Sequence, residues 1–552
     1  MGIHKIKRIL SLAVIFLITM FMLTIKIGYI QLHKNRTFTL EAMEQRIRTL
    51  VQTDNRGDIL DRNGIPFANR TKEKKVAVFP NCVYDTAGTA RMLSKIVEGT
   101  DKDKLETRLN NKKGFEIYTL KDNGKLTSEI PWNKRNFEGL IFFEQPKRYE
   151  KDGIANHVIG YTRASDNKGV AGLEYTFNEF LTGKREDILS VMMDAGNRVI
   201  PSGVSTKEGS PSHRGSNIVL TLDYNAQSIV EQHAEKLGQR GAIIVVDVKT
   251  GDIIAMASRP NFDQTNINKA SEVSGCLLNN CILPYQLGSV FKIVTTAAAL
   301  ENGIISPKNN FYCHGSTSVQ GWKYQCYTED VGGCGHITFE EAFARSCNTT
   351  FVQVAQRTGG DKILDMAKKF GLGQKVNIFL PWEREGSLPS VMEVQGPGIG
   401  NLTLGQGSVQ VTPLQVADMI TTIANNGIRK KLRLVDSIRD NKDNIIAENL
   451  KSDMGRVISI STALTLKRLL AKATLEGTGA NAYIKEVGGT AGKTGTAKFS
   501  EDINYIWFAG YYPVDRPKYV IVVFNAGQGS SSQNAVPIFR DIVLDMEKIV
   551  IE

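Results

Sequence analysis

Ser289 and Lys292 could form a nucleophile and its base without a histidine. They lie three positions apart in the segment 284–303, whose apolar residues recur with helical spacing, so both side chains are expected on one helix face. A helix N-terminus would favour the serine alkoxide, and a lysine of lowered pKa could take the proton. Alone this spacing is a weak signal, because it recurs between Ser165 and Lys168 in a polar stretch and because Ser289 could simply cap the helix.

Two later motifs carry further polar side chains that such a nucleophile would need. Ser346 and Asn348 flank Cys347 between two predicted helices, and the run 493–496, Lys-Thr-Gly-Thr, falls in a predicted strand. Glycines around this run also suggest a phosphate-binding loop. Such a loop, however, requires glycine where this chain has Val487, and it leads into a helix rather than a strand. Spacing and context therefore both argue against a nucleotide site.

The elements around these motifs predict a mixed α+β domain from residue 216 onward. A strand and then an amphipathic helix beginning near Tyr224 open this domain. The segment 241–258 contains two β-rich runs joined at 249–251 by a second Lys-Thr-Gly, which is typical of a hairpin turn in which glycine supplies a positive φ. Two more strand-like runs lie within 504–527. Only the later Lys-Thr-Gly thus has a context that suits chemistry.

The N-terminus predicts a membrane anchor. A basic stretch at 4–8 precedes an uncharged run at 9–25, and apolar residues resume after Lys26 as far as Ile30. Roughly 20 mostly apolar residues span a bilayer, and the basic flank remains in the cytoplasm, which places the rest of the chain outside. A cleaved signal peptide is the alternative, but the run is long for one and no small-residue cleavage pattern follows. We therefore expect a single-pass protein of the cell membrane.

Length and charge limit the other possibilities. The 552 residues are too many for one compact core, so two or more domains are expected. The formal charge of +11 favours membrane lipid, an acidic wall polymer or nucleic acid as surroundings, although a lysine-rich solvated surface would give the same value. No short basic cluster with interleaved aromatic residues stands out, which argues against nucleic acid.

Ser-x-x-Lys, Ser-x-Asn and Lys-Thr-Gly, in this order, resemble the three active-site motifs of penicillin-binding proteins and serine β-lactamases. Further segments are similar to those of class B penicillin-binding proteins: RGDILDRNG from Arg56, KGVAGLEYTFNEFLTG from Lys168, LTLGQGSVQVTPLQVA from Leu402, EGTGANA from Glu476 and WFAGYYP from Trp507. The resemblance covers nearly the whole chain. It implies an α+β multidomain protein whose transpeptidase domain contains a five-stranded antiparallel sheet flanked by helices. The implied parts are a cytoplasmic tail at 1–8, a transmembrane anchor at 9–30, an extended α+β pedestal of the dimerisation type at 31–215 and the transpeptidase domain at 216–552.

The resemblance implies a serine-type peptidoglycan DD-transpeptidase, which serves cell-wall synthesis and cell shape. In that family's mechanism Ser289 attacks the penultimate D-Ala of a stem peptide, with Lys292 as its base. Ser346 then relays a proton to the leaving amine, Lys493 holds the network electrostatically, and Asn348 bonds the substrate amide. The result is a serine acyl-enzyme that the amine of a second stem peptide converts into a cross-link.

The Lys-Thr-Gly-Thr strand is implied to bind the substrate. Thr494 and Thr496 would bind the terminal carboxylate, which β-lactam antibiotics mimic, and Gly495 would let the substrate approach the strand. The backbone N–H groups of Ser289 and Thr496 would form the oxyanion hole. The implied partners are peptidoglycan stem peptides, β-lactams, the membrane and a membrane-embedded glycosyltransferase.

Other functions of the same fold remain as alternatives. These are a β-lactamase or β-lactam sensor, a DD-carboxypeptidase, and a scaffold that binds division or elongation proteins. The box at Arg56 and the large membrane-side module argue against the first, since a free drug can be hydrolysed or sensed without either. The complete motif set argues against a scaffold without activity.

Four of the seven cysteines fall within 313–347, where this chain departs from the family. The residues predicted to hold a structural zinc ion there are Cys326, Asp330, Cys334 and His336, with Cys313, His314 and Glu329 as substitutes. A disulfide, Cys313–Cys326 or Cys326–Cys334, is the alternative outside the cell. The odd third cysteine and the nearby histidine favour the metal. Cys347 is expected to be a packed small residue rather than a ligand or nucleophile.

Overall fold

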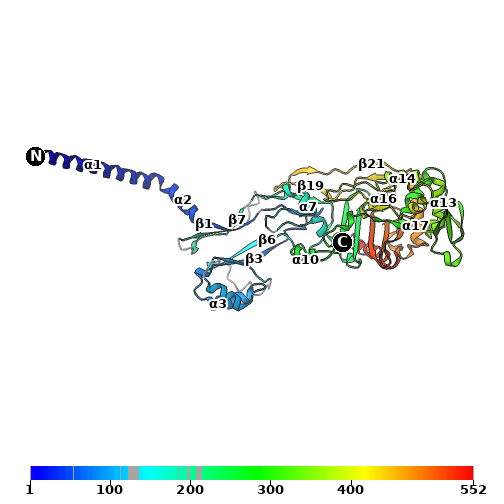
Figure 1. Ribbon diagram of the computed structural model, residues 1–552, viewed down its shortest axis with the longest axis horizontal. Coiled ribbons are helices and arrows are strands. Elements are labelled where there is room, and N and C mark those ends of the chain that lie inside the picture. The colour runs from blue at the N-terminus through cyan, green and yellow to red at the C-terminus, as the bar shows by residue number, and fades with distance from the viewer. Residues whose placement is uncertain are drawn as a thin grey trace. The chain divides into compact units, whose positions relative to one another are not determined.

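The structure is a computed structural model that describes residues 2–53, 55–111, 114–121, 136–137, 139–163, 165–184, 186–194, 199–206 and 214–550 (Figure 1). Parts of the predicted pedestal, among them 122–135 and 207–213, lie outside the described residues. The chain divides into two compact units. The first comprises Met1–Asn55, Lys72–Pro146 and Lys184–His213, and the second comprises Arg56–Thr71, Lys147–Gly183 and Arg214–Glu552.

A long N-terminal helix coincides with the predicted membrane anchor. Helix α1 spans Gly2–Tyr29 and continues through a π-helical turn, Ile30–Lys34, into α2, Asn35–Arg46. Its apolar side chains are exposed, as is Leu17 at 66%, and such surface is unfavourable in water and favourable in lipid. The helical stretch Gly2–Thr39 is long and apolar enough to cross a membrane by length and composition.

The first unit contains two sheets, of order β1-β7-β8 and β4-β3-β6-β5. Val76 and Val78 of β3 lie in one apolar cluster with α3 and α4, whereas Ala77 lies in a second cluster on the opposite face. This alternation buries both faces of the strand. The elements are β1 (Ile47–Thr53), β3 (Thr71–Val78), α3 (Thr86–Ile96), α4 (Lys102–Asn110), β4 (Glu116–Thr119), β5 (Asn136–Phe137), β6 (Leu140–Lys147), β7 (Glu186–Met193) and β8 (Val199–Thr206).

A five-stranded antiparallel sheet of order β11-β10-β24-β23-β22 forms the centre of the second unit, as predicted. Ile243 and Val245 point into an apolar cluster with α9 and α18, whereas Ile244 and Val246 point into the cluster that contains α16. Helices thus cover both faces of the sheet. These elements are α9 (Tyr224–Ala234), β10 (Arg240–Asp247), β11 (Ile253–Arg259), α16 (Pro413–Ala424), β22 (Ala491–Lys498), β23 (Asn504–Tyr512), β24 (Tyr519–Gly527) and α18 (Ala535–Val550).

Two predictions about this sheet are confirmed. Helix α9 begins at Tyr224, and the hairpin of β10 and β11 turns at Gly251, which has a φ of 77°. The remaining elements of the second unit are β2 (Ile59–Leu60), α6 (Asn156–Ile159), α7 (Gly172–Thr176), α8 (Asn178–Leu181), β9 (Asn217–Leu220), α10 (Ile267–Ser271), β12 (Tyr285–Gln286), α11 (Lys292–Glu301), β13 (Asn310–Cys313), β14 (Ser316–Val319), β15 (Trp322–Gln325), β16 (Gly335–Thr338), α12 (Phe339–Ala344), α13 (Asn348–Thr358), α14 (Gly360–Lys369), α15 (Gly398–Thr403), β17 (Gln410–Val411), β18 (Ile428–Lys430), β19 (Val435–Arg439), β20 (Ile445–Glu448), β21 (Asp453–Arg456) and α17 (Ile460–Leu475).

The RGDILDRNG segment belongs to the second unit, where it is held by strand pairing and by a buried ion pair. Its strand β2 pairs in parallel with β9. The carboxylate of Glu174, which is fully buried, accepts hydrogen bonds from Arg56 Nε at 2.7 Å and lies 2.6 Å from Arg148 Nη2. A buried charge requires such partners, so these two arginines fix the segment and α7 together.

Candidate active site

Ser289 lies in a tight turn that leads into helix α11. The turn, Gly288–Phe291, is a 3-10 helix, whereas the sequence predicts an ordinary helix start here. Ser289 is partly buried, and its hydroxyl forms no hydrogen bond with any residue that the structure describes. The hydroxyl of this candidate nucleophile is therefore not held by another side chain among the described residues.

Lys292 joins the first two motifs. Its side chain is fully buried, and Nζ donates hydrogen bonds to Ser346 O at 2.6 Å, to Ser346 Oγ at 3.2 Å and to Asn348 Oδ1 at 2.7 Å. Nζ also lies 5.2 Å from the centre of the Phe351 ring. Burial lowers the pKa of Lys292 to about 8, because the charged form loses its hydration. A lysine with this pKa can accept a proton near neutral pH.

The Ser-x-Asn motif occupies the junction between α12 and α13. Ser346 has a φ of 57°, in the left-handed region that is unfavourable for a non-glycine residue, and such strain clusters at functional sites. Cys347 is the residue before α13, and Asn348 is its first residue. The Asn348 Nδ2 group donates to Gln325 O at 2.8 Å, which fixes the amide with its oxygen toward Lys292.

Lys493 is the second fully buried lysine of the site. Burial and the positive charge of Lys292 lower the pKa of Lys493 well below its usual value. Its Nζ donates to Thr494 O at 3.3 Å. Because two neighbouring buried ammonium groups repel each other, the charge of Lys292 disfavours the charged form of Lys493.

Two glycines allow the Lys-Thr-Gly-Thr strand to lie against the Ser289 turn. A Cβ atom on Gly288 would lie 2.7 Å from Thr496 O, and a Cβ atom on Gly495 would lie 2.7 Å from Leu287 O. Both distances are shorter than real Cβ contacts allow. Strand β22 is thereby held beside the candidate nucleophile.

Two residues outside the predicted site support the threonines of this strand. Thr478 Oγ1 and Thr494 Oγ1 lie 2.6 Å apart, and Ser531 Oγ lies 3.1 Å from Thr496 Oγ1 while it donates to Gly495 O at 2.6 Å. Thr478 falls in the EGTGANA segment, whose similarity to class B penicillin-binding proteins could have pointed to it. Ser531 precedes α18 in a serine-rich stretch, and no sequence motif marks it, because its role depends on tertiary contact.

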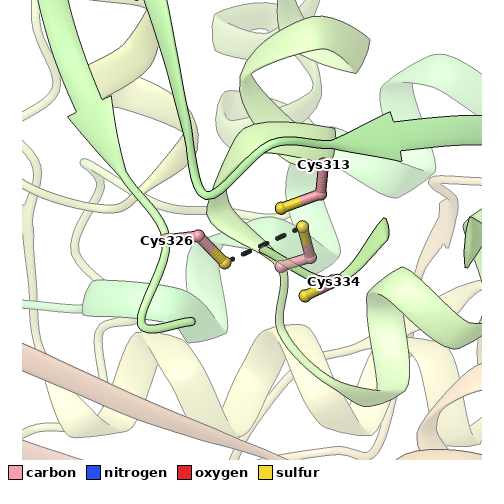
Figure 2. Close-up of side chains that lie close together, drawn as sticks. Cys313, Cys326 and Cys334 are labelled. Carbon is pink, nitrogen blue, oxygen red and sulfur yellow. Dashed lines mark hydrogen bonds between the residues drawn. The ribbon is translucent and has the colours of Figure 1, made fainter. Parts of the chain in front are cut away.

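The structure divides the predicted metal ligands. Cys326 and Cys334 lie close together, whereas Asp330 and His336 are exposed and lie outside their cluster. Asp330 is in a short 3-10 turn, and the His336 ring packs edge-on against Tyr312, 4.7 Å between ring centres. The positions beside Cys326 and Cys334 are taken instead by Cys313 and Cys347. Figure 2 labels Cys313, Cys326 and Cys334.

Comparison with known proteins assigns a family to this arrangement. Residues 241–544 match the family model of the penicillin-binding protein transpeptidase domain, and residues 52–220 match that of the penicillin-binding protein dimerisation domain. Stage V sporulation protein D of Bacillus subtilis is 29% identical over 545 residues, which cover 94% of this chain and 81% of that protein. Peptidoglycan D,D-transpeptidase FtsI of Escherichia coli is 26% identical, with 94% of this chain and 87% of that protein covered.

A solved structure agrees with these relatives. Penicillin-binding protein 3 of Mycobacterium tuberculosis in complex with aztreonam is 25% identical with a TM-score of 0.64, and the match covers 91% of this chain and 97% of that one. The chain therefore belongs to the penicillin-binding proteins that carry a transpeptidase domain. Since a dimerisation domain precedes that domain, it is a class B penicillin-binding protein.

Proposed function

We propose that the protein is a peptidoglycan DD-transpeptidase that works through an acyl-enzyme on Ser289. The observation that carries this proposal is the buried Lys292, which is hydrogen-bonded to Ser346 and Asn348 and has a pKa of about 8. A catalytic base needs a pKa near the working pH and a position beside the proton that it accepts. An ordinary buried lysine in a structural ion pair would have a carboxylate partner instead.

The reaction follows from these positions. Ser289 Oγ forms a bond to the carbonyl carbon of the penultimate D-Ala, and Lys292 accepts the hydroxyl proton. The peptide bond to the terminal D-Ala breaks, and the proton held by Lys292 passes through the Ser346 hydroxyl to the departing amine, so that D-Ala leaves as a neutral amine. An amine from a second stem peptide then attacks the ester, forms the cross-link and returns the proton, which restores Ser289.

The strand β22 supplies binding and charge stabilisation. The backbone N–H groups of Ser289 and Thr496 are the donors for the developing oxyanion. Thr494 and Thr496 bind the terminal carboxylate, and Ser531 and Thr478 hold their hydroxyls in place. A β-lactam presents the same carboxylate and an acylating carbonyl, so it traps Ser289 as an ester.

The helix Gly2–Thr39 anchors the chain in the cell membrane with the catalytic unit on the outer side, as the basic N-terminal flank supports. There it meets lipid-linked and polymerised stem peptides and a membrane-embedded glycosyltransferase that makes the glycan. Association with such a partner is tested by co-purification in detergent of the full chain and a form that lacks residues 2–39. Co-purification that survives this deletion would contradict a membrane-level contact.

Fluorescent penicillin labelling of the full chain tests the nucleophile. Ser289→Ala should abolish the covalent label, whereas Ser165→Ala, which removes the serine of the other Ser-x-x-Lys spacing, should retain it. Unchanged labelling of Ser289→Ala would refute the assignment.

Product analysis with a stem pentapeptide and an acceptor amine separates the possible activities. A cross-linked dimer supports transpeptidation, and free tetrapeptide alone supports a carboxypeptidase. Rapid turnover of the penicillin ester would favour a β-lactamase.

A further inference from the structure

Four cysteine thiols meet beside the Ser-x-Asn motif. The Sγ atoms of Cys313, Cys326, Cys334 and Cys347, called here the thiol cluster, all lie within 4.8 Å of one another. All four thiols are free, three of the residues are buried, and Cys334 is partly buried. Figure 2 shows the side chains of Cys313, Cys326 and Cys334 directed toward one another. Such a gathering brings four potential ligands to one point.

The fold brings the four residues together from separate elements. Cys313 ends β13, Cys326 follows β15, Cys334 precedes β16, and Cys347 precedes α13. Strands β13 and β16 are paired so that Cys313 lies opposite Gly335. The thiols of Cys313 and of Cys334, the residue before Gly335, therefore lie on neighbouring segments of the sheet. Tertiary structure rather than local spacing therefore defines the cluster.

Main-chain contacts hold the turns that carry these thiols. Cys326 N donates to Gly315 O at 2.7 Å, and Gly333 N donates to Thr328 O at 2.9 Å. Gly315 and Gly333 both have a φ of 92°, and a Cβ atom on Gly333 would lie 2.1 Å from Cys313 O. Only glycine permits this close approach of the two loops. The backbone is thus built to keep the thiols near one point.

We propose that the thiol cluster binds one structural zinc ion through four sulfurs. Zinc–sulfur bonds of about 2.3 Å in a tetrahedron place the sulfurs about 3.8 Å apart. The Cys326 and Cys347 sulfurs already lie 3.9 Å apart, and the spread of the other sulfurs needs only small side-chain adjustments. An all-thiolate tetrahedral site is typical of zinc. Two disulfides would use the same four sulfurs only in pairs, whereas one tetrahedral ion accounts for all four sulfurs meeting at a single point.

The zinc ligands proposed here differ in part from those that the sequence predicts. Cys313, which the sequence named as a substitute, and Cys347, which it expected only to pack, take the places of Asp330 and His336, whose exposed side chains lie outside the cluster. Four protein ligands leave no open coordination position, so the ion is structural and takes no part in the reaction.

The ion would fix the catalytic loop. Cys347 lies between Ser346 and Asn348, the two residues that accept hydrogen bonds from Lys292. A metal bond at Cys347 would hold the strained left-handed backbone of Ser346 and the start of α13 in place. The ion would therefore position Ser346 and Asn348, the hydrogen-bond partners of Lys292, without itself contacting the reacting atoms.

Metal analysis of the full chain, purified in detergent under reducing conditions without added metal, tests the site. We expect close to one zinc per chain, and substantially less in each of Cys313→Ser, Cys326→Ser, Cys334→Ser and Cys347→Ser. The matched control is Cys281→Ser, which alters a buried cysteine outside the cluster and should retain the ion. Asp330→Asn and His336→Gln should retain it as well.

X-ray absorption at the zinc edge of the unaltered protein gives a result that does not depend on whether variants fold. Four sulfur neighbours at about 2.3 Å support the proposal. Two sulfurs with two nitrogen or oxygen neighbours, or loss of zinc in Asp330→Asn or His336→Gln, would overturn it. Far less than one zinc per chain, iron in its place, or disulfides among the four cysteines would do the same. These outcomes are independent of penicillin labelling, so failure of the zinc site leaves the assignment of Ser289 intact.

Discussion

Lys292 and Lys493 are both fully buried, and burial together with the charge of Lys292 lowers the pKa of Lys493 well below its usual value. The two lysines come from the first and third motifs, which are far apart in the sequence. Their mutual repulsion in a medium of low polarity disfavours two charged ammonium groups. Burial and like charge therefore both lower the pKa of Lys493 toward the range in which a lysine can exchange a proton.

The rate of acylation should depend on pH through Lys292. The pKa of Lys292 is lowered to about 8, and only the neutral amine accepts a proton, so the reactive fraction rises as the pH rises. Below pH 8 the rate constant for penicillin should rise about tenfold per pH unit, and it should level off above the pKa. Rates measured between pH 6 and 9, corrected for spontaneous hydrolysis, check this; a flat profile would contradict it.

The arginine variant of the same residue provides a second test. Lys292→Arg keeps a positive charge at every pH used, because a guanidinium does not lose its proton in proteins. Penicillin labelling should be lost across the whole range. The control is Lys168→Arg, in the polar stretch that has the same spacing, and it should leave the profile unchanged.

The close approach of the Ser289 turn to β22 should be sensitive to one methyl group. In Gly288→Ala the new Cβ would meet Thr496 O at 2.7 Å, in addition to the cost of alanine at a φ of 61°. Acylation should fall at least about tenfold, equivalent to about 1.4 kcal/mol. Gly303→Ala is the matched control: its φ is 67°, but nothing lies within 4 Å of the new Cβ, so only stability should change, by about 1–2 kcal/mol. Equal loss of acylation in both variants would argue against the steric explanation.

Ser531 should position the Lys-Thr-Gly-Thr strand rather than react. Its hydroxyl donates to Gly495 O at 2.6 Å and lies 3.1 Å from Thr496 Oγ1. Ser531→Ala removes both hydrogen bonds, each worth about 1 kcal/mol, and should lower acylation by up to roughly 30-fold. Ser532→Ala, next to it and exposed, is the control. The midpoint of the pH profile should stay at the same pH, and a displaced midpoint would indicate a direct role in proton transfer.

The buried carboxylate of Glu174 should be essential for stability. Glu174→Ala leaves the charges of Arg56 and Arg148 buried without their partner, which should lower the free energy of unfolding by about 3–5 kcal/mol. The comparison is Asp166→Ala, which removes the exposed ion pair to Arg163 and should cost less than about 1 kcal/mol. Urea unfolding of the full chain measures both, and similar losses in the two variants would contradict the structural role.

The second unit follows closely from sequence patterns. The β-rich runs, the glycine turn at Gly251 and the helix start at Tyr224 are local features with strong periodicity, and the structure places each where expected. The early segment Arg56–Thr71 is different: it joins the second unit through the pairing of β2 with β9 and the ion pair of Arg56 with Glu174, and no local pattern reports contacts between such distant residues.

The sequence by itself predicted which residues carry the chemistry, because Ser-x-x-Lys, Ser-x-Asn and Lys-Thr-Gly occur together in the order of the family's active-site motifs. Only the tertiary structure decided that the pKa values of the two lysines are lowered, since burial depends on every element that surrounds them. It also decided the members of the thiol cluster. Short spacing selects Asp330 and His336, but their side chains face solvent, whereas Cys347 reaches the other thiols through the turn between α12 and α13.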